Sequence, residues 1–508
     1  MSTGLPEVRP VQDERIDRAL QLSEDERLDF KRVRNVDSIL KAACAMANTR
    51  GGWLVLGIGD PRKEQGRQRV YGVEEAPETL GEVRRGFVQK ISPPLLPPHI
   101  GEVTETLIRC TLRDGSTGTV ALLCIPRSNA VHSLVDGGTY VRFASQSRQL
   151  SANEITELSL RRGVHSAVDA TVDVPVELLD TQWYRQYASN RQLTRPVQEQ
   201  LQHLGLSRKV ESGAWMPTRA AVLLFAESPG GLLEQKCSVR IFHYRGHQVE
   251  HIENTSLVAP PVTVDGPVLK QIREATEAVS RMLSSGVLVS TTGLEIRQRY
   301  PRRVIQEAIT NAVIHRDYRL SRDIHIRVFA NRIEVESPGV FPGAVTAANV
   351  REIGSHPRNR ALVDHLREFP APPNLDAGEG VRMMYQTLES EGLYPPVYQA
   401  EDELGRESVL VTLLNEARHS EWLLVEDYLK QHDTIRNVDL RRILNCPSPV
   451  KASKMLHDWV DKNLLVVANP EQGTRVRRYR IKPLPERVET VDQLLSGILG
   501  KQSSDVRK

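Results

Sequence analysis

The sequence predicts a multi-domain α+β protein, and three observations support this fold class. The chain has 508 residues, too many for one ordinary core, because domains average roughly 150 residues. Hydrophobic residues make up 40% and charged residues 26% of the chain, as in globular proteins. Segments with strand periodicity alternate with segments of helical periodicity. We expect folded parts at 22–162, 176–290, 295–416 and 417–484, between mobile tails at 1–21 and 485–508.

Composition and charge restrict the functions that the chain can have. No apolar run approaches the roughly 20 residues of a membrane helix, and the N-terminus lacks the apolar stretch of a signal peptide. We therefore expect a cytoplasmic protein without membrane contact. The five cysteines form no C-x-x-C pair, which argues against a disulfide framework and a structural zinc site. The net charge of +3 is nearly balanced, so a nucleic-acid signal has to be local.

The first part, residues 22–162, has the pattern of a sheet with helices. Strands are expected at 28–31, 53–58, 107–112, 119–125 and 140–143. Helical spacing at 36–47 predicts a helix between the first two strands. Ser151 and Glu154 have the spacing of a capping box, which predicts a helix start at this position.

Three carboxylates and a lysine lie at the ends of these strands. Asp29 and Lys31 share one face of the first strand, because side chains repeat every two residues. Glu24 precedes that strand, and Asp60 follows the buried one. Such a set can hold Mg²⁺ or Mn²⁺ and act as a metal nuclease does, with Asp29 and Asp60 as metal ligands and Lys31 on the nucleic acid. The alternative is that Asp29 and Lys31 form a solvated strand face and Asp60 begins a turn.

The segments 28–31, 45–58 and 140–143 resemble the Schlafen AlbA-type domain. The resemblance implies a domain that binds nucleic acid. Some Schlafen proteins cut tRNA with a cluster of three carboxylates, and Glu24, Asp29 and Asp60 are the best counterparts here. Many bacterial relatives are described only as DNA-binding, so the resemblance does not decide between binding and cleavage.

A polar stretch at 163–175 is expected to be a linker. The second part, residues 176–290, is expected to be a connecting α/β region. Its expected elements are helices at 182–192 and 196–204, strands at 220–225 and 239–244, and further helix between 260 and 294.

The third part, residues 295–416, begins with the sharpest motif of the chain, a helix that starts after Pro301. Two neighbouring edges of this helix repeat every four residues, an apolar one at Ile305, Ile309 and Val313 and a polar one at Glu307, Asn311 and His315. A half-buried carboxylate and amide are costly without partners. Mg²⁺ bound to phosphates is a suitable partner, with Asn311 offering its carbonyl oxygen and Glu307 orienting or deprotonating a water. The alternative is that Glu307 and Asn311 only bridge within the helix and that His315 is structural.

Strand patterns at 324–329 and 332–336 predict a hairpin after this helix. Ser337, Pro338 and Gly339 follow it, with Gly343 shortly after. Further on, Gly378 and Gly380 precede an apolar helix, and glycines at such a place let backbone N–H groups approach phosphate.

This order of motifs resembles the GHKL ATPase fold, and the phrase from Asn311 to Tyr318 resembles its divergent RecG-like branch. The resemblance implies ATP and Mg²⁺ as cofactors, in a GHKL-like α/β sandwich. Glu307 then matches the catalytic position and Asn311 the metal position. The glycines match two family motifs, Gly339 and Gly343 on the adenine side and Gly378 and Gly380 in the phosphate lid.

The chain departs from that family at one position that matters for adenine. The aspartate of D-x-G-x-G is absent, and Ser337-Pro338-Gly339 stands in its neighbourhood. No Walker A motif is present either, so helicase activity is not predicted. The pattern therefore favours ATP binding as a switch over hydrolysis, and at most a weak ATPase. GHKL proteins often form dimers, and a homodimer or higher homo-oligomer is expected by analogy only.

The fourth part, residues 417–484, predicts three short helices followed by a hairpin, the pattern of a winged helix-turn-helix. Lys451 and Lys454 lie on the exposed side of the candidate recognition helix. The hairpin's return strand is basic at Arg475, Arg477, Arg478 and Arg480. Such a wing can contact phosphates, although winged helices also dock proteins.

Three functions remain open from the sequence. The first is a regulator, such as a transcriptional regulator, in which ATP binding modulates DNA binding. The second is an ATP-gated metal-dependent nuclease that acts on RNA or single-stranded DNA, for example in phage defence. The third is a docking scaffold with a degenerate nucleotide site. We rank the regulator first, because a winged helix has no obvious purpose in a simple nuclease.

Overall fold

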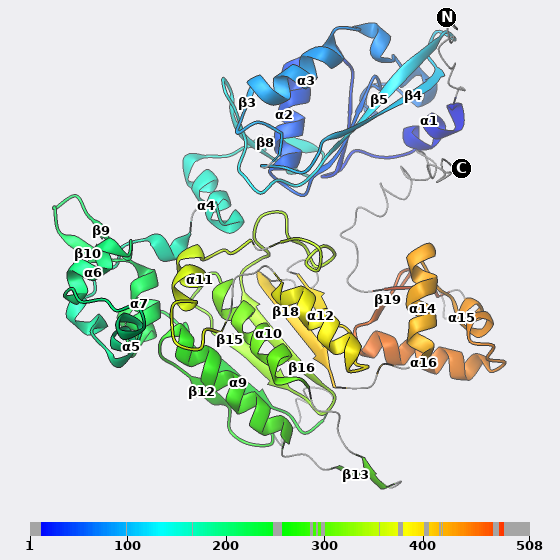
Figure 1. The fold of residues 1–508 in the computed structure, drawn as a ribbon. Helices are drawn as coiled ribbons and strands as arrows, with labels where there is room; N and C mark the ends of the chain where they lie inside the picture. Colours follow the sequence, from blue (N-terminus) through cyan, green and yellow to red (C-terminus); the bar gives the residue numbers. More distant parts are fainter. Residues whose placement is uncertain are drawn as a thin grey trace, which may run out of the picture. The chain divides into compact units, whose positions relative to one another are not determined.

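The computed structural model describes most of the chain. The described residues are 12–97, 99–164, 166–246, 257–284, 288–290, 293–295, 300–354, 356–373, 379–400, 406–415, 418, 420–470 and 477–481. They fall into two compact units, divided between residues 164 and 165 (Figure 1). None of the helices formed by these residues combines the length and apolarity needed to cross a membrane. Among the described residues, no two cysteines form a disulfide.

The first unit contains two four-stranded sheets. Its helices are α1 (Asp13–Leu20), α2 (Val36–Ala47), α3 (Thr79–Gln89) and α4 (Ala152–Arg162). Its strands are β1 (Leu28–Lys31), β2 (Gly52–Leu56), β3 (Ile91–Ser92), β4 (Thr104–Thr111), β5 (Thr117–Ile125), β6 (Ser133–Leu134), β7 (Gly138–Phe143) and β8 (Gln146–Gln149). The strand orders are β1-β2-β5-β4 and β3-β6-β7-β8, with β1 parallel to β2.

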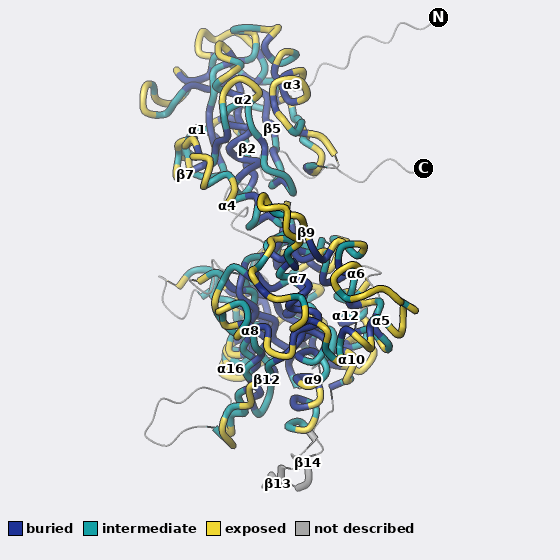
Figure 2. Tube along the Cα trace, turned by 90° about the vertical axis from the view of Figure 1, so that its left-hand side faces the viewer, coloured by how far each residue is buried: buried dark blue, intermediate teal, exposed yellow. Residues whose placement is uncertain are grey.

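The central strands β2 and β5 are buried on both faces (Figure 2). Leu54 and Leu123 pack with α2 and α3 on one face, whereas Val55 and Leu122 pack with α1 on the other. The continuous apolar run of β2 follows from this, because a strand covered twice has no solvent face. The predicted capping box is present, since Ser151 and Glu154 exchange hydrogen bonds at the start of α4.

The second unit is built on a six-stranded sheet of order β12-β11-β15-β16-β18-β17. The sheet strands are β11 (Val239–His243), β12 (Val262–Val264), β15 (Ile324–Val328), β16 (Arg332–Pro338), β17 (Val397–Gln399) and β18 (Ser408–Leu414). Helices α9 (Val268–Ser284), α10 (Arg302–Ile314) and α12 (Gly380–Ser390) cover one face of it (Figure 1). The predicted hairpin is the antiparallel pair β15–β16.

Smaller elements precede and follow this layer pair. The preceding elements are α5 (Gln182–Asn190), α6 (Val197–His203), β9 (Ser207–Lys209), β10 (Trp215–Pro217), α7 (Arg219–Phe225) and α8 (Pro229–Leu232). Two short strands, β13 (Leu288–Ser290) and β14 (Gly293–Glu295), follow α9, and α11 (Arg360–Leu366) follows β16. The C-terminal module consists of α14 (Ser420–Gln431), α15 (Asn437–Ile443), α16 (Pro449–Asp461), β19 (Leu465–Val467) and β20 (Tyr479–Ile481).

The multi-domain α+β class is confirmed, but three local predictions are wrong. Residues 13–20, expected in a mobile tail, form α1, which buries Ile16 in the first unit. The expected linker at 163–175 buries Val168 and Val174 in the core of the second unit. The expected strand at 220–225 is helix α7, capped by Thr218, whose hydroxyl accepts the Ala221 N–H. Residues 1–11 and 482–508 lie outside the described residues.

The expected boundary near residue 295 also differs from the structure. Strands β11 and β12 belong to the predicted connecting region, yet β11 pairs in parallel with β15. The connecting region and the predicted nucleotide-binding part therefore share one sheet and one hydrophobic core.

Candidate nucleotide site

A cavity of about 520 Å³ lies beside α10 in the second unit. Its walls come from α10, the end of β16, the loop after β16, the start of α12, and strands β17 and β18. Ligand pockets commonly measure about 300–1,000 Å³. The cavity is therefore large enough for a nucleotide.

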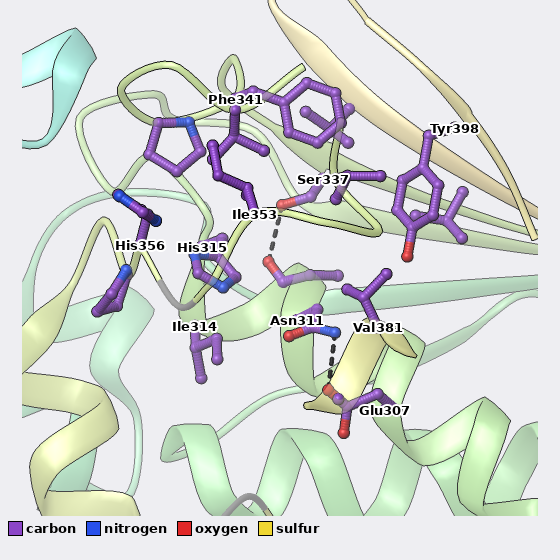
Figure 3. A pocket seen from close by; sticks show the side chains of 18 of the residues that line it. Glu307, Asn311, Ile314, His315, Ser337, Phe341, Ile353, His356, Val381 and Tyr398 are labelled. Atoms are coloured by element: carbon purple, nitrogen blue, oxygen red, sulfur yellow. Dashed lines mark hydrogen bonds between the residues drawn. The ribbon is translucent and has the colours of Figure 1, made fainter. Parts of the chain in front are cut away.

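Helix α10 presents its polar edge to this cavity. Glu307, Asn311 and His315 line the cavity in that order, one helical turn apart (Figure 3). Ile305, Ile309 and Val313 lie on the opposite side of α10, not on a neighbouring edge as predicted, because residues two apart lie about 200° apart around a helix; all three are buried in the core. The helical spacing in the sequence thus places three polar side chains in one pocket.

The Glu307 carboxylate contacts both α10 and the start of α12. The Asn311 side chain donates from Nδ2 to Glu307 Oε1 at 2.9 Å. Burial raises the pKa of Glu307, although the Asn311 hydrogen bond opposes the shift. A Cβ atom at Gly380 would overlap the Glu307 carboxylate. Because residue 380 is a glycine, the Glu307 carboxylate can lie directly against the first residue of α12.

Replacing Glu307 with glutamine is expected to stabilise the second unit at pH 7–8. A carboxyl whose pKa is raised in the folded state lowers the stability of the protein as the pH rises above the pKa of the unfolded state. Glutamine does not ionise, so it removes this loss. The gain should vanish below about pH 4, where the unfolded carboxyl is protonated too. Calorimetry of the full chain between pH 4 and 8 measures this. A loss of stability at pH 7 would contradict the burial argument.

Glu336 provides a control of opposite sign. Burial alone would raise the pKa of Glu336, but hydrogen bonds from Arg406 and Arg327 hold it at about 2. Glu336→Gln is therefore expected to cost about 2–3 kcal/mol at pH 7. That cost should shrink as the pH falls from about 4 towards 2, because the folded carboxyl then becomes protonated as well.

Residues 316–318, which follow α10, fix the neighbouring backbone through buried side chains. Arg316, fully buried, donates from Nη2 to the backbone carbonyls of Lys236, Leu320 and Arg322. Asp317 pairs with Arg319 at 2.5 Å and with Arg358 at 3.5 Å. The Tyr318 hydroxyl donates to the carbonyl of Val313. Of residues 315–318, only His315 lines the cavity, and the side chains of the other three hold the fold.

The predicted adenine-side residues have mixed placements. Ser337 lines the cavity, and its hydroxyl donates to the carbonyl of Ala312 at 2.7 Å (Figure 3). Gly339 lines it too, with a positive φ of 110°. Gly343 also has a positive φ but does not line the cavity. Of the two glycines predicted for the phosphate lid, Gly380 lines the cavity and Gly378 lies outside the described residues.

Sequence reasoning missed several residues that build this pocket. Arg358 is buried and donates to the carbonyls of His315 and Val340. Asn359 donates to the carbonyls of Ile314 and Arg316, which closes the end of α10. Tyr398, from β17, lines the wall of the cavity that the sheet forms (Figure 3). The sequence gives no signal for Arg358 and Asn359, because their burial and their partners become visible only in the fold.

The carboxylates of the first unit are arranged differently from the prediction. Asp29 is only 1% exposed, so the solvated-face alternative is wrong. Its two oxygens pair separately, one with Arg142 at 2.8 Å and one with Lys31 at 2.5 Å. The Arg142 side chain is likewise 1% exposed. Asp29 is thus part of a buried ion pair that joins β1 to β7.

Glu24 lies close to Asp29, whereas Asp60 begins a turn. Burial, and then the neighbouring Asp29 carboxylate, raise the pKa of Glu24. Glu24 Oε1 also accepts the Phe30 N–H. Asp60 accepts the Arg62 N–H at 2.8 Å. Across the described residues, no group of three or more His, Cys, Asp or Glu side chains is placed to hold a metal ion.

The predicted basic residues that the structure describes lie on α16 and within 477–481, the segment that contains β20. Lys451 and Lys454 are exposed on α16. Arg478 is exposed and Arg477 and Arg480 are partly exposed around β20. Arg475 lies outside the described residues. The predicted three helices and hairpin strands are present, around a core that includes Trp422 and Trp459.

Comparison with known proteins identifies two domain types. Residues 24–151 match the family model "Schlafen, AlbA_2". Residues 321–413 match the model "Putative ATP-dependent DNA helicase recG C-terminal". The second match begins after α10, so Glu307 and Asn311 lie before the matched residues. No curated protein is significantly similar to the chain.

Among solved structures, the chain is similar to the DIP2311 protein from Corynebacterium diphtheriae. The two chains are 18% identical over 95% of this chain and 98% of that one, with a TM-score of 0.38. The two family matches confirm the suspected domain composition, a Schlafen AlbA-type domain and a RecG-like ATPase-type domain. Together they indicate an ATP-binding function related to nucleic acid.

Proposed function

We propose that a chain with these two domains is a regulatory protein, and that ATP in the α10 pocket controls its binding to DNA. The observation that carries this proposal is the pocket itself. A buried carboxylate, an amide one turn away and the glycine start of α12 meet in one nucleotide-sized cavity. A buried acid with a raised pKa in a cavity is typical of functional sites.

Asn311 is the residue that would hold Mg²⁺ with the nucleotide, and Glu307 would orient a water beside it. The Asn311 amide group already donates to Glu307, which leaves its carbonyl oxygen for a metal. Mg²⁺ favours oxygen ligands and keeps several waters. Gly380 begins an 11-residue helix, whose N-terminal N–H groups favour phosphate. When bound, the metal would neutralise phosphate charge beside the buried acid.

We propose ATP as a switch, with hydrolysis at most a minor activity. Ser337 lies near the position at which the family has its adenine-recognising aspartate, which this chain lacks. Its hydroxyl already donates a hydrogen bond to the carbonyl of Ala312. A switch needs only a difference in affinity for ATP between two states of the protein. It does not need turnover.

The C-terminal module is the proposed DNA-binding element, a winged helix with α16 as recognition helix. Within the described part of the chain, neither Lys451 nor Lys454 forms an ion pair. Free, exposed lysines on one helix suit DNA phosphates. We extend this to transcriptional regulation as the proposed role.

Strand β17 supports a link between the pocket and this module. Tyr398 lines the cavity, while the preceding residue, Val397, belongs to the hydrophobic core of the C-terminal module. Tyr394 packs edge-on against Trp422 of α14, with ring centroids 6.0 Å apart. A nucleotide that moves Tyr398 would therefore also act on the packing beneath α14.

Duplex DNA binding with and without ATP and Mg²⁺ tests the proposal. We expect ATP to change the dissociation constant of the full chain by about 5–150-fold, the usual range of coupling between sites. Asn311→Ala should remove this ATP effect and leave ATP-free DNA binding unchanged. Equal DNA affinity with and without saturating ATP would overturn the proposed switch.

Lys451→Ala combined with Lys454→Ala is expected to weaken duplex binding at low salt about tenfold or more. The slope of log affinity against log salt should fall by about 2, since each phosphate contact contributes about 1. Lys430→Ala is the matched control, because Lys430 is exposed on α14 but pairs with Asp427. An unchanged salt slope in the double variant would exclude α16 as the phosphate-binding surface.

A metal-dependent nuclease is the second candidate. The closeness of Glu24 to Asp29 favours it, because coupled carboxylates are common in catalytic sites. The two ion pairs of Asp29 oppose it, since they occupy both carboxylate oxygens. RNA and single-stranded DNA cleavage with Mn²⁺, compared between wild type and Glu24→Gln, separates this candidate from the regulator.

A further inference from the structure

One polar atom in the pocket stands apart from the rest. His315 lines the cavity (Figure 3), and its ring nitrogen Nδ1 is buried without a hydrogen-bond partner among the described residues. The other imidazole in the wall differs, because His356 Nδ1 lies 3.0 Å from the carbonyl of Gly354. The Ser337 hydroxyl also has a partner, since it donates to the carbonyl of Ala312. A buried polar atom without a partner costs free energy, so His315 is suited to a ligand.

His315 lies at the end of the pocket away from α12. The first residue of α12, Gly380, meets Glu307, and His315 follows Glu307 by two helical turns. At 1.5 Å per residue this is about 12 Å along the helix axis. Apolar side chains gather at the same end, including Phe341 and Ile353 (Figure 3). An apolar end suits a nucleoside better than a phosphate.

The charge state of His315 agrees with this assignment. Burial, and then the nearby Arg358 guanidinium, lower the pKa of His315 to about 4. The imidazole is therefore neutral at pH 7 and has one N–H donor and one acceptor nitrogen. A neutral ring offers little attraction to phosphate, but it can pair with a ribose hydroxyl or with the edge of a base.

We propose that His315 recognises the nucleoside half of the bound nucleotide through a hydrogen bond at Nδ1. This inference rests on the proposed nucleotide site and names the residue that reads the ligand at the end opposite α12. His315 thereby contributes specificity, while Asn311 and the start of α12 serve the phosphate end.

Calorimetric titration of the full chain with two ligands tests the assignment. The ligands are ATP and inorganic tripolyphosphate, each with Mg²⁺, because tripolyphosphate lacks the nucleoside. His315→Phe keeps a flat ring without hydrogen-bonding atoms, and His315→Asn keeps a polar atom near the position of Nδ1. His356→Phe is the matched control from the same wall. Thermal melting reports separately whether each variant is folded.

We expect His315→Phe to weaken ATP binding about tenfold, the usual effect of one lost hydrogen bond. Its tripolyphosphate affinity should stay at the wild-type value. His315→Asn should recover most of the ATP affinity, and His356→Phe should change it less than about twofold. Unchanged ATP affinity in His315→Phe, or equal losses for both ligands, would overturn the inference. Failure of the wild type to bind ATP would instead refute the nucleotide site.

Discussion

Asp29→Ala is expected to destabilise the first unit by about 3–5 kcal/mol, the usual cost of removing one partner of a buried ion pair. The cost arises because the Arg142 guanidinium, whose side chain is 1% exposed, would lose the carboxylate that compensates its burial. Arg142 also donates to the carbonyl of Asp25 at 2.8 Å, which alone cannot neutralise the charge. Calorimetry of the full chain, followed at the transition of the first unit, measures the loss.

Two further variants separate the ion pair from other effects of the substitution. Asp37→Ala is the control, because Asp37 pairs with Lys90 while its side chain is 80% exposed, and exposed pairs contribute at most about 1 kcal/mol. The double variant Asp29→Leu with Arg142→Met should regain most of the stability, since apolar residues can replace a buried pair. A loss below about 1 kcal/mol in Asp29→Ala would mean that the carboxylate is free to bind a metal.

The predictable parts of the molecule are those with local causes. Helix α10 follows from a four-residue repeat, and its polar edge at Glu307, Asn311 and His315 faces one cavity as that repeat requires. The hairpin β15–β16 follows from alternation on both sides of a short turn. In each case the signal lies within about twenty residues, where periodicity is informative.

The burial of Asp29 depended on a partner far along the chain. Alternation placed Asp29 opposite the apolar face of β1, which is correct. The structure covers that second face with the β7–β8 hairpin, whose Arg142 is 113 residues away. Nothing local to residues 28–31 reveals such a partner, so a buried ion pair and a solvated face have the same pattern.

Helix α7 shows a second kind of limit. Its residues 220–225 are all apolar and all buried, so no polar position marks a helical or a strand period. A short apolar run cannot be assigned by periodicity alone. The signal that indicates a helix is Thr218. A threonine just before a helix can cap it, because its hydroxyl accepts a backbone N–H of the first turn.

The shared sheet of the second unit was hidden for a topological reason. Strand β11 joins β15 in parallel across α9 and α10, and a connection of that length looks like a domain boundary in composition. Arg358 and Asn359 were missed for a related reason, because they act on the end of α10 from more than 40 residues away. The pocket's walls therefore required the structure, although its polar edge did not.

Gly339→Ala is expected to destabilise the second unit by about 2–6 kcal/mol. The residue has a φ of 110°, which a side chain adopts at a cost of about 1–3 kcal/mol. In addition, its new Cβ would lie 2.7 Å from Asp317 Cβ and 3.2 Å from Asp317 N, and such overpacking costs about 1–3 kcal/mol more. Asp317 cannot retreat easily, because its N–H donates to the carbonyl of Pro338 and its carboxylate pairs with Arg319.

The same substitution should weaken ATP binding, because Asp317 also pairs with Arg358, which donates to the carbonyls of His315 and Val340 in the pocket wall. Gly354→Ala is the matched control. Gly354 lines the same cavity, but a Cβ there would meet no atom within 4 Å and the backbone needs no positive φ. We expect Gly354→Ala to change stability by less than about 0.5 kcal/mol. Equal effects of the two alanines on melting and on ATP affinity would show that Gly339 is not required by the approach of Asp317, and that the wall of the pocket is set by other contacts.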